Sequence, residues 1–382
     1  MRYYKNSNKM RIGFDAKRAF YNQTGLGNYS RDSIRILSHF FQDNDYFLYT
    51  PKLIQNNRLS FLDERENCHT RVPFSLVGNL FKKYWRSKNI VKDLIQDEID
   101  IYHGLSHELP LGIEKTKIKS VVSIHDLIFI RYPHLFNTID RKIYHKKFLS
   151  ACKRADKIIA ISKQTKSDII EFFNIPENKI KVVYQGCNAI FQKSIPNDQK
   201  QKVISKYNLP RNFLLHVSSI TERKNLLNIL KSIQKINNQH LVIIGDGKSY
   251  KNKCLEYIRK HKLSDRVHLI HNINLKEMAA IYQSADIMLY PSLFEGFGLP
   301  ILEALFSKTP VITSKGGCFS EAGGKHSIYI NPLSNKELTQ AIIKIQSDKN
   351  LSVKMIEEGY QYAQNFTEDK VAKNLFNIYK NL

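Results

Sequence analysis

Two carboxylates, Glu295 and Glu303, flank a glycine turn in the stretch FEGFGLPILEAL. Gly296 and Gly298 allow the backbone to approach a ligand closely, and Pro300 suits the first turn of a helix. The free amides of a helix N-terminus attract an anion, but carboxylates beside them call for a cationic sugar ring or a set of hydroxyls. In the alternative interpretation, Glu303 complements the helix dipole from the first turn and Glu295 is solvated.

Two adjacent cations, Arg223 and Lys224, stand where a helix is expected to begin, shortly after an apolar run that ends at Val217. Cations oppose the helix dipole at that position, so their placement favours an anionic ligand, most simply a diphosphate. Ordinary surface cations are the alternative. The glycine turn that contains Gly245 follows another apolar run and would suit a nucleoside, although a plain turn explains it equally well.

The N-terminal half offers weaker candidates at the ends of its apolar runs. Gly25 and Gly27 open a predicted helix, but this G-x-G lacks the third glycine of a dinucleotide fingerprint. His125 and Asp126 follow one predicted strand and His103 ends another. An imidazole at the carboxyl end of a strand is a candidate for catalysis or for binding hydroxyls. A structural role in the core is the alternative for each histidine.

Short apolar runs alternate with longer amphipathic stretches along the whole chain, and this alternation predicts parallel α/β sheets. In such sheets ligands bind at the carboxyl ends of strands, where the residues above are expected to lie. The predicted strands are 11–14, 46–49, 100–103, 120–124, 157–161 and 180–184, followed by 213–217, 240–244, 267–270, 287–290 and 310–313. The predicted helices are 28–41, 138–154, 163–173, 225–237, 249–261, 276–284 and 300–307, one or two within 335–366, and 368–382.

A chain of 382 residues exceeds what one hydrophobic core usually organises, so two domains are expected. The polar stretch 189–201 contains Pro196 and shows no hydrophobic periodicity, which favours a linker. The sequence therefore predicts two tandem doubly wound, Rossmann-like α/β domains.

The charge is strongly positive, with 59 Lys and Arg against 35 Asp and Glu and a net charge of +24. Such a surface attracts nucleic acid, anionic lipid headgroups or phosphorylated ligands, unless it is simply rich in lysine without a dedicated site. The five cysteines are scattered and form no C-x-x-C pair, which favours reduced thiols and argues against a disulfide framework or a zinc site. We find no secretory signal and no run of membrane-spanning length, so a cytoplasmic protein is expected.

Taken together, the motifs resemble those of the retaining family-4 glycosyltransferases with the two-domain B-type fold. The strongest is the E-x7-E pattern EGFGLPILE, and the resemblance covers the chain from Met10 onward. The supporting stretches are TGLGNYSR, VSIHDLIFIRYP, ADKIIAISKQTKSDI, KVVYQG, ERKN, VIIGDG and Asn331-Pro332.

The resemblance implies three catalytic residues and a set of residues that bind the donor. Lys224, with Arg223 beside it, would hold the donor diphosphate, and Glu295 would contact hydroxyls of the transferred hexose. Glu303 would bind the ribose hydroxyls, and His125 would lie near the anomeric carbon. The remaining donor-binding residues would be Gly25, Gly27, Ser219, Gly245, Gly296, Phe297, Gly298 and Leu299, with His103 and Asp126 on the acceptor side.

One departure from the family pattern bears on the donor. Many members have Gly-Arg where this chain has Ser218-Ser219, so a hydroxyl replaces an arginine that helps to bind the diphosphate. Phosphate binding would then depend more on Lys224 and Arg223. The pattern is similar to a branch that contains mannosyltransferases, which favours GDP-mannose over UDP-sugars as the donor.

The resemblance also implies the organisation of the chain and its reaction. Residues 1–192 would form an acceptor-binding domain and 193–366 a donor-binding domain facing it across a central cleft, with 367–382 crossing back as a helix onto the first. A hexose would pass with retention of configuration to a glycan or lipid-linked acceptor in O-antigen, capsule or lipopolysaccharide assembly. No cofactor is expected, and no metal, because Asp43 and Asp45 spell D-x-D only in a polar loop.

Two alternatives to a transferase stay open, a sugar-nucleotide epimerase of the same fold and a basic nucleic-acid-binding protein. The basic residues are spread over both halves, which argues against a nucleic-acid partner. Aromatic and basic residues mix in 80–88 and 141–148, so peripheral contact with an anionic membrane at its inner face is expected. Solvated helix faces with buried aromatic rings are the alternative for these two segments.

Overall fold

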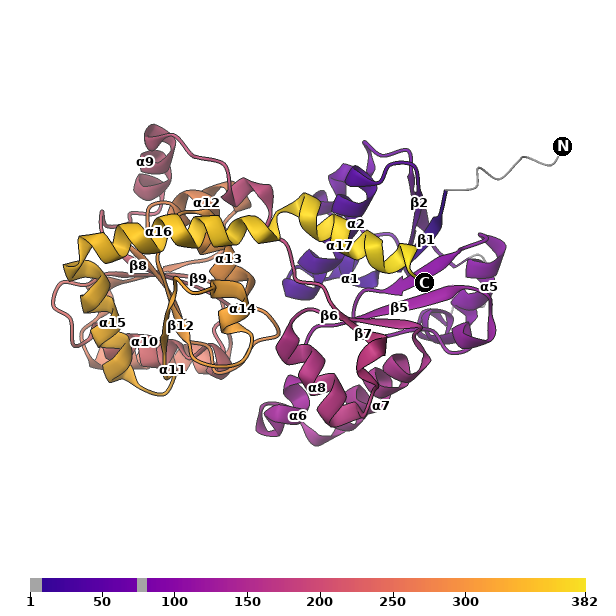
Figure 1. Ribbon diagram of the computed structural model, residues 1–382. Coiled ribbons are helices and arrows are strands. Elements are labelled where there is room, and N and C mark those ends of the chain that lie inside the picture. Colours follow the sequence, from indigo (N-terminus) through magenta and orange to yellow (C-terminus); the bar gives the residue numbers. More distant parts are fainter. Residues whose placement is uncertain (1–8, 74–80) are drawn as a thin grey trace. The chain divides into compact units, whose positions relative to one another are not determined.

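The computed structural model describes residues 9–73 and 81–382, which form two compact units. The first unit runs to Gln185 and also includes Glu368–Leu382, and the second is Gly186–Thr367 (Figure 1). Residues 186–192, which we expected in the first domain, belong to the second unit. The reason is local packing, because Phe191 is buried and its ring meets that of Tyr282 edge to face, 5.5 Å between centroids.

The first unit contains a seven-stranded parallel sheet in the order β3-β2-β1-β4-β5-β6-β7. Its central strands are buried on both faces, as their continuous apolar runs require. The order reverses between β1 and β4, which creates a switch point where ligands bind in doubly wound folds. The strands are β1 Arg11–Asp15, β2 Asp45–Tyr49, β3 Cys68–Arg71, β4 Ile101–Gly104, β5 Lys119–Ile124, β6 Lys157–Ala160 and β7 Ile180–Val182.

Helices cover this sheet, and several begin with a side-chain cap. Asn137 accepts a hydrogen bond from the amide of Asp140 at the start of α7, and Ser162 accepts one from Thr165 at the start of α8. The helices are α1 Lys17–Tyr21, α2 Gly25–Phe40, α4 Lys82–Tyr84, α5 Ile90–Gln96, α6 Ile128–Arg131, α7 Thr138–Arg154 and α8 Lys163–Phe173, with a π-helical turn, η2, over Trp85–Asn89.

The helix α17, Glu368–Lys380, packs against α2 and belongs to the first unit although it follows the whole second unit in the chain (Figure 1). Phe376 stacks on Phe41 with ring centroids 3.9 Å apart. Glu368 forms an ion pair with Arg35 at 2.6 Å. These contacts bury the apolar face of α17 and fix it to the sheet of the first unit.

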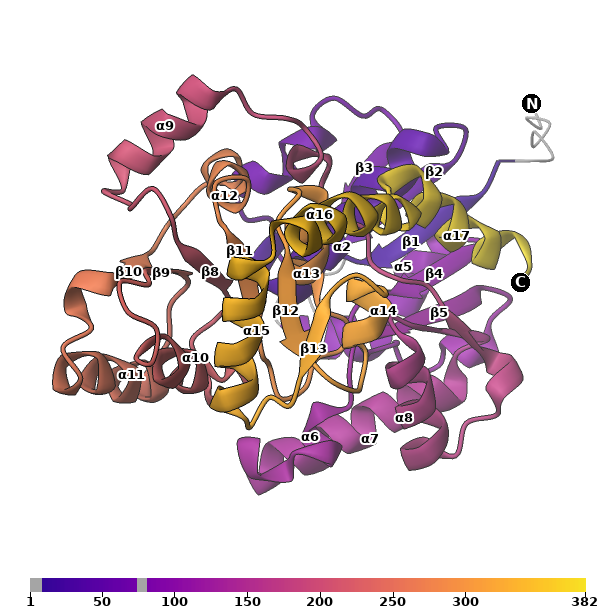
Figure 2. The same ribbon diagram turned by 60° about the vertical axis from the view of Figure 1, so that its left-hand side comes forward.

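The second unit contains a six-stranded parallel sheet in the order β10-β9-β8-β11-β12-β13, with its switch point between β8 and β11. Helices α10 and α11 lie on one side of it, and α12, α13 and α16 on the other (Figure 2). The two doubly wound sheets confirm the predicted fold class. The strands are β8 Leu214–Val217, β9 Leu241–Ile244, β10 Val267–Ile270, β11 Ile287–Tyr290, β12 Val311–Ser314 and β13 Ile328–Ile330.

The helices of the second unit include two that the sequence did not indicate, α9 and the short α14. The stretch 189–201 was interpreted as a linker, but it contains a 3₁₀ turn over Ala189–Phe191 and the start of α9, Asn197–Lys206. None of the residues of α9 is buried, so it lacks the apolar stripe that reveals a helix in a sequence. The others are α10 Leu226–Ile233, α11 Ser249–Lys260, α12 Leu275–Tyr282, α13 Leu299–Phe306, α14 Phe319–Gly323, α15 Asn335–Ser347 and α16 Lys349–Ala363.

Candidate functional site

The switch point of the second unit holds a buried cluster of opposite charges. Arg223 and Lys224 end a short 3₁₀ turn after β8, and Glu295 follows β11. Glu295 Oε1 lies 2.6 Å from an Arg223 guanidinium nitrogen and 2.7 Å from Lys224 Nζ. Lys224 also donates a hydrogen bond to the hydroxyl of Tyr290, at 2.6 Å. The structure thus brings together three of the residues that the sequence singled out.

The electrostatic balance of this cluster follows from burial and ion pairing. Lys224 and Glu295 are only 8% and 9% exposed. Burial by itself would raise the pKa of Glu295, but Lys224 and Arg223 outweigh it and lower that pKa to about 2. Burial lowers the pKa of Lys224 from its ordinary value, while Glu295 opposes this shift. Glu295 is therefore a carboxylate at neutral pH, held by two cations.

Asn225, the last residue of ERKN, ties three loops of the second unit together. Its left-handed backbone, with φ of 61°, ends the 3₁₀ turn before α10 begins. Its side-chain amide donates to the carbonyls of Pro291, at 3.1 Å, and Pro332, at 2.6 Å. The amide of Leu293 donates to the carbonyl of Arg223, at 2.8 Å. These bonds join ERKN to the loop that leads into the glycine turn and to Asn331-Pro332, so three motifs that are distant in the sequence lie together in the fold.

The glycine turn is shaped by one glycine and one cysteine. Gly298 precedes α13 with φ of 114°, a conformation that side chains with a Cβ rarely adopt. The thiol of the buried Cys318 contacts the carbonyls of Glu295, at 3.2 Å, and Phe297, at 2.9 Å. Cys318 was not among the predicted site residues, since no spacing pattern links it to the turn. Gly296 and Leu299 are half-buried in the same turn.

Glu303 has a tyrosine hydroxyl as a hydrogen-bond partner. It is buried and accepts a hydrogen bond from the hydroxyl of Tyr282 on α12, at 2.8 Å. Its predicted position in the first turn of the helix is wrong, because α13 begins at Leu299 and has no acidic residue in its first turn. Glu303 therefore does not act on the helix dipole.

The loops after β8 and β9 cross at very short range. A Cβ on Gly245 would lie 1.8 Å from the carbonyl oxygen of Ser218, so this glycine is required by the protein itself. Ser219 is exposed in the same loop. The hydroxyl of Ser218 bonds to Nε2 of the buried His216, at 2.7 Å, while Nδ1 of His216 donates to the carbonyl of Leu289. His216 was not predicted, since it lies within the apolar run of the strand.

In the first unit, some of the candidate site residues lie at the surface and others are buried. Gly25 is exposed with open space around it, whereas a Cβ on Gly27 would lie 1.8 Å from the carbonyl oxygen of Asn22. His125 is buried, and its Nε2 donates to the carbonyl of Leu105, at 2.9 Å. Burial lowers the pKa of His125 to about 4, so the ring is neutral at pH 7. Asp126 accepts from the amide of Ile128, at 3.2 Å.

His103 has the position of a core residue. It is fully buried, with Nδ1 bonded to the hydroxyl of Tyr379 at 2.7 Å and Nε2 to that of Ser123 at 2.8 Å. The hydroxyl of Tyr29 completes the network 2.7 Å from Ser123. Burial lowers the pKa of His103 to about 3. Both ring nitrogens are used inside the protein, which favours the structural alternative for this histidine.

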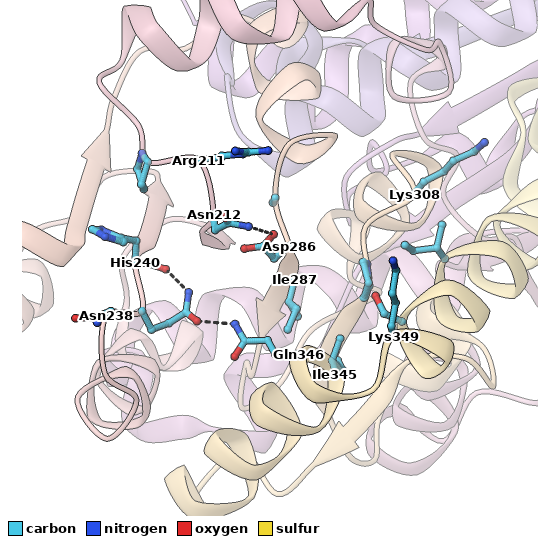
Figure 3. A pocket seen from close by; sticks show the side chains of 16 residues that line it. Arg211, Asn212, Asn238, His240, Asp286, Ile287, Lys308, Ile345, Gln346 and Lys349 are labelled. Atoms are coloured by element: carbon cyan, nitrogen blue, oxygen red, sulfur yellow. Dashed lines mark hydrogen bonds between the residues drawn. The ribbon is translucent and has the colours of Figure 1, made fainter.

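A cavity of about 900 Å³ lies at the other end of the second sheet, before the strands begin. Asn212 precedes β8, and its amide donates to the carboxylate of Asp286, which precedes β11, at 3.3 Å (Figure 3). Gln346 donates to Gln239 across the same cavity, at 2.6 Å. Its lining includes none of the candidate site residues. Size alone therefore does not locate the candidate site.

Within 9–73 and 81–382, no three or more His, Cys, Asp or Glu side chains are grouped so that they could hold a metal ion. In the same part of the chain, none of the helices has the length and apolar character that crossing a membrane requires.

Comparison with known proteins assigns both halves of the chain. A family model described as glycosyl transferases group 1 matches residues 197–362, and one described as glycosyltransferase family 4 matches residues 49–189. The O-antigen chain mannosyltransferase RfbU of Salmonella typhimurium is 28% identical over 242 residues, 63% of either chain, so this chain spans just under two thirds of that relative. The O-antigen chain mannosyltransferase B of Escherichia coli is 24% identical, covering 73% of this chain and 74% of that protein.

Solved structures agree in fold. A glycosyltransferase from Rickettsia africae superposes with a TM-score of 0.77 at 20% identity, over 98% of each chain. Anabaena HepE, crystallised with UDP and glucose, superposes with a TM-score of 0.76 at 17% identity, over 98% of this chain and all of that one. These structures confirm the two-domain B-type fold. The two family models confirm the resemblance that the motifs carry, and the chain belongs to the family-4 glycosyltransferases.

Proposed function

We propose that this protein transfers a hexose, with mannose favoured, from a nucleoside-diphosphate sugar to a glycan or lipid-linked acceptor in the assembly of a surface polysaccharide. The observation that carries the proposal is the buried cluster of Arg223, Lys224 and Glu295 at the switch point of the second unit. A diphosphate needs cations, and a hexose needs a hydrogen-bond acceptor for its hydroxyls. This cluster supplies both within a few ångströms.

In the proposed reaction, configuration at the anomeric carbon is retained without an enzymic nucleophile. As the bond from C1 to the leaving phosphate breaks, the acceptor hydroxyl attacks on the same face, and the departing phosphate takes its proton. Lys224, assisted by Arg223, stabilises the charge that develops on the phosphate, and Glu295 holds hexose hydroxyls. His125 is assigned a position near C1. Its ring acts there as a neutral dipole, because burial lowers its pKa to about 4.

The other donor contacts follow the same proposal. The carboxylate of Glu303 is assigned to the ribose hydroxyls, and Ser219 and Gly245 to the nucleotide, with the backbone of 296–299 facing the sugar and phosphate. Gly25 is assigned to the approach of the donor phosphates, since it is exposed and has open space around it. The lysine supplies the positive charge at the leaving group, so transfer is proposed to proceed without a metal ion, and EDTA should leave the rate unchanged.

GDP-mannose is the favoured donor because two relatives are named mannosyltransferases and because a serine stands where many family members have a phosphate-binding arginine. The competing donor is a UDP-sugar, because the similar Anabaena HepE was crystallised with UDP-glucose. Thermal shift with GDP, UDP and other nucleotides ranks the bases. Incubation with GDP-mannose, UDP-glucose and related donors then follows the released nucleotide and the fate of the sugar.

Slow release of GDP and free mannose, accelerated by an acceptor, supports the transferase. Interconversion of the intact sugar nucleotide would instead support an epimerase of the same fold. Tight, salt-sensitive binding of RNA without any sugar-nucleotide binding would overturn the proposal.

A further inference from the structure

A second cavity, of about 330 Å³, lies wholly within the first unit at the switch point between β1 and β4. Asp15 at the end of β1 and Tyr102 in β4 form part of its wall. The π-helical turn η2 and helix α7 form two other sides. These are the two segments in which the sequence mixes aromatic and basic residues, so the fold brings both to one cavity; Leu80, at the start of the first segment, lies outside the described residues.

The cavity is positively charged. Arg86 is fixed at its base by ion pairs at 2.9 Å to both Asp15 and Glu108. Lys147 pairs with the other oxygen of Glu108, at 3.2 Å, and Lys146 is exposed at the wall. The lining holds four cations, Arg86, Lys146, Lys147 and Arg154, against two carboxylates, Asp15 and Glu108. Glu114 outside the lining pairs with Arg154, at 3.4 Å, which still leaves an excess of positive charge.

The remaining wall is apolar and continues onto an exposed rim. Leu109, Pro110 and Leu111 line one side and Ile143 of α7 another. Leu111 is 50% exposed and Ile143 45%, and the amide of Leu111 donates to the carbonyl of Ser87, at 2.8 Å, which holds this rim against η2. A fully hydrated anion gains nothing from such a wall, whereas a ligand with an anionic head and an apolar stem satisfies both parts.

We propose that this cavity binds the phosphate group of a phosphorylated lipid, with the first part of its hydrocarbon stem on Leu111 and Ile143. A volume of about 330 Å³ accommodates a phosphate and a few methylenes, so the rest of the stem extends out of the cavity past its exposed rim. That this lipid is the glycosyl acceptor rests on the proposed function. The binding itself does not, because neither the donor nor the second unit contributes to the cavity.

The test uses geranyl phosphate as the probe, with geraniol and inorganic phosphate for comparison, on the full chain without donor. Trp85, the only tryptophan, is buried in η2 next to Arg86, so its fluorescence reports binding. Geranyl phosphate should bind more tightly than either comparison compound by at least about tenfold. If geraniol binds equally well, the cavity recognises only the apolar stem. If inorganic phosphate binds equally well, it recognises only the anion. Either result overturns the proposal.

Helix α7 provides matched controls for both parts of the ligand. Lys146→Glu should weaken the binding of geranyl phosphate by about tenfold. Lys142→Glu makes the same change outside the lining and should have little effect on that binding. Ile143→Ser should weaken it by about threefold, and the control Ile139→Ser should not. All four side chains are exposed, so the variants are expected to fold. Equal losses in variant and control would overturn the proposal.

The outcome is separable from that of the proposed function. Lipid binding without turnover of any sugar nucleotide would refute the transferase and leave this site standing. Turnover of GDP-mannose in a protein that does not bind geranyl phosphate would do the reverse.

Discussion

The ammonium nitrogen of Lys224 lies 2.7 Å from Glu295 Oε1, so the proposed phosphate-binding cation is already neutralised by the proposed hexose-binding carboxylate. Arg223 contacts the same oxygen, at 2.6 Å. A donor diphosphate must therefore compete with Glu295 for both cations. When it does so, the carboxylate is released for the hexose hydroxyls, which couples recognition of the phosphate to recognition of the sugar.

This coupling predicts opposite effects of Glu295→Gln on binding and on transfer. The neutral amide no longer competes for the cations, so GDP should bind about tenfold more tightly, equivalent to ~1.4 kcal/mol. Transfer should fall by roughly 10²–10³, because the amide holds the hexose poorly. Isothermal titration with GDP and a transfer assay measure the two, with the exposed Glu256→Gln on α11 as the control. Weaker GDP binding in the variant would contradict the competition.

Replacement of Lys224 tests the cation itself. Lys224→Met keeps much of the side-chain volume but removes the charge, so transfer should fall by roughly 10²–10³ and GDP should bind more weakly. Lys231→Met on α10 makes the same change at an exposed position and should leave both unchanged. Circular dichroism and the melting temperature establish that both variants are folded. Full activity in folded Lys224→Met would remove this residue from the mechanism.

The lowered pKa of Glu295 predicts an acid-sensitive fold. Its pKa falls from an ordinary 4.5 to about 2 in the folded protein, so its stabilisation is complete above pH 4.5 and is lost as the pH falls toward 2. The loss should amount to about 3 kcal/mol for the second unit, an order-of-magnitude figure. Urea unfolding of wild type and Glu295→Gln between pH 5 and 2.5 measures it. Parallel pH profiles for the two proteins would show that the ion pairs do not stabilise the fold.

Gly25 and Gly27 should separate a ligand contact from a structural need. Gly27→Ala places a Cβ against the carbonyl of Asn22 and should lower the stability of the first unit by about 1–3 kcal/mol. Gly25→Ala meets open space and should not destabilise the protein, yet it should raise the KM for the donor if Gly25 approaches the donor as proposed. Melting curves and donor kinetics on both variants test this. An unchanged KM in Gly25→Ala would exclude Gly25 from the donor site.

Tyr379→Phe tests how firmly α17 is fixed to the first unit. The change leaves Nδ1 of the buried His103 without its partner and should cost about 1–3 kcal/mol. The fluorescence of Trp85 follows the unfolding of this unit in urea, and the exposed Tyr84→Phe should change stability by less than about 0.5 kcal/mol. Equal stability of the two variants would mean that the bond between Tyr379 and His103 does not help to hold α17.

The sequence predicts the elements whose hydrophobic pattern is complete. The strands β10 and β11 and the helices α7 and α8 have the predicted bounds. For β11 and α8 a continuous or periodic apolar pattern explains the agreement. α7 buries only Ala151 and Cys152, and its start is marked by the cap at Asn137 rather than by an apolar stripe. β3, with the sequence CHTR, was missed because this edge strand is only partly buried and has no apolar run.

For the candidate site, the sequence located the loops but not the bonds between them. Strand ends place Lys224 and Glu295 at one edge of a parallel sheet, so their proximity follows from fold class alone. The ion pair between Arg86 and Asp15 joins residues 71 positions apart, and nothing in the spacing marks it. The same holds for Cys318 beneath the glycine turn. Such contacts depend on how loops pack, which periodicity does not encode.

The return of α17 to the first unit has a consequence for biosynthesis. Phe41, on which Phe376 stacks, and His103, which bonds to Tyr379, are synthesised early, whereas their partners are synthesised after the entire second unit. At a translation rate of about 5–20 residues per second, this part of the first unit stays uncovered for roughly 10–40 s before α17 is synthesised. During that interval the nascent chain displays an apolar surface to chaperones, and the ribosome must complete the second unit before the first can close.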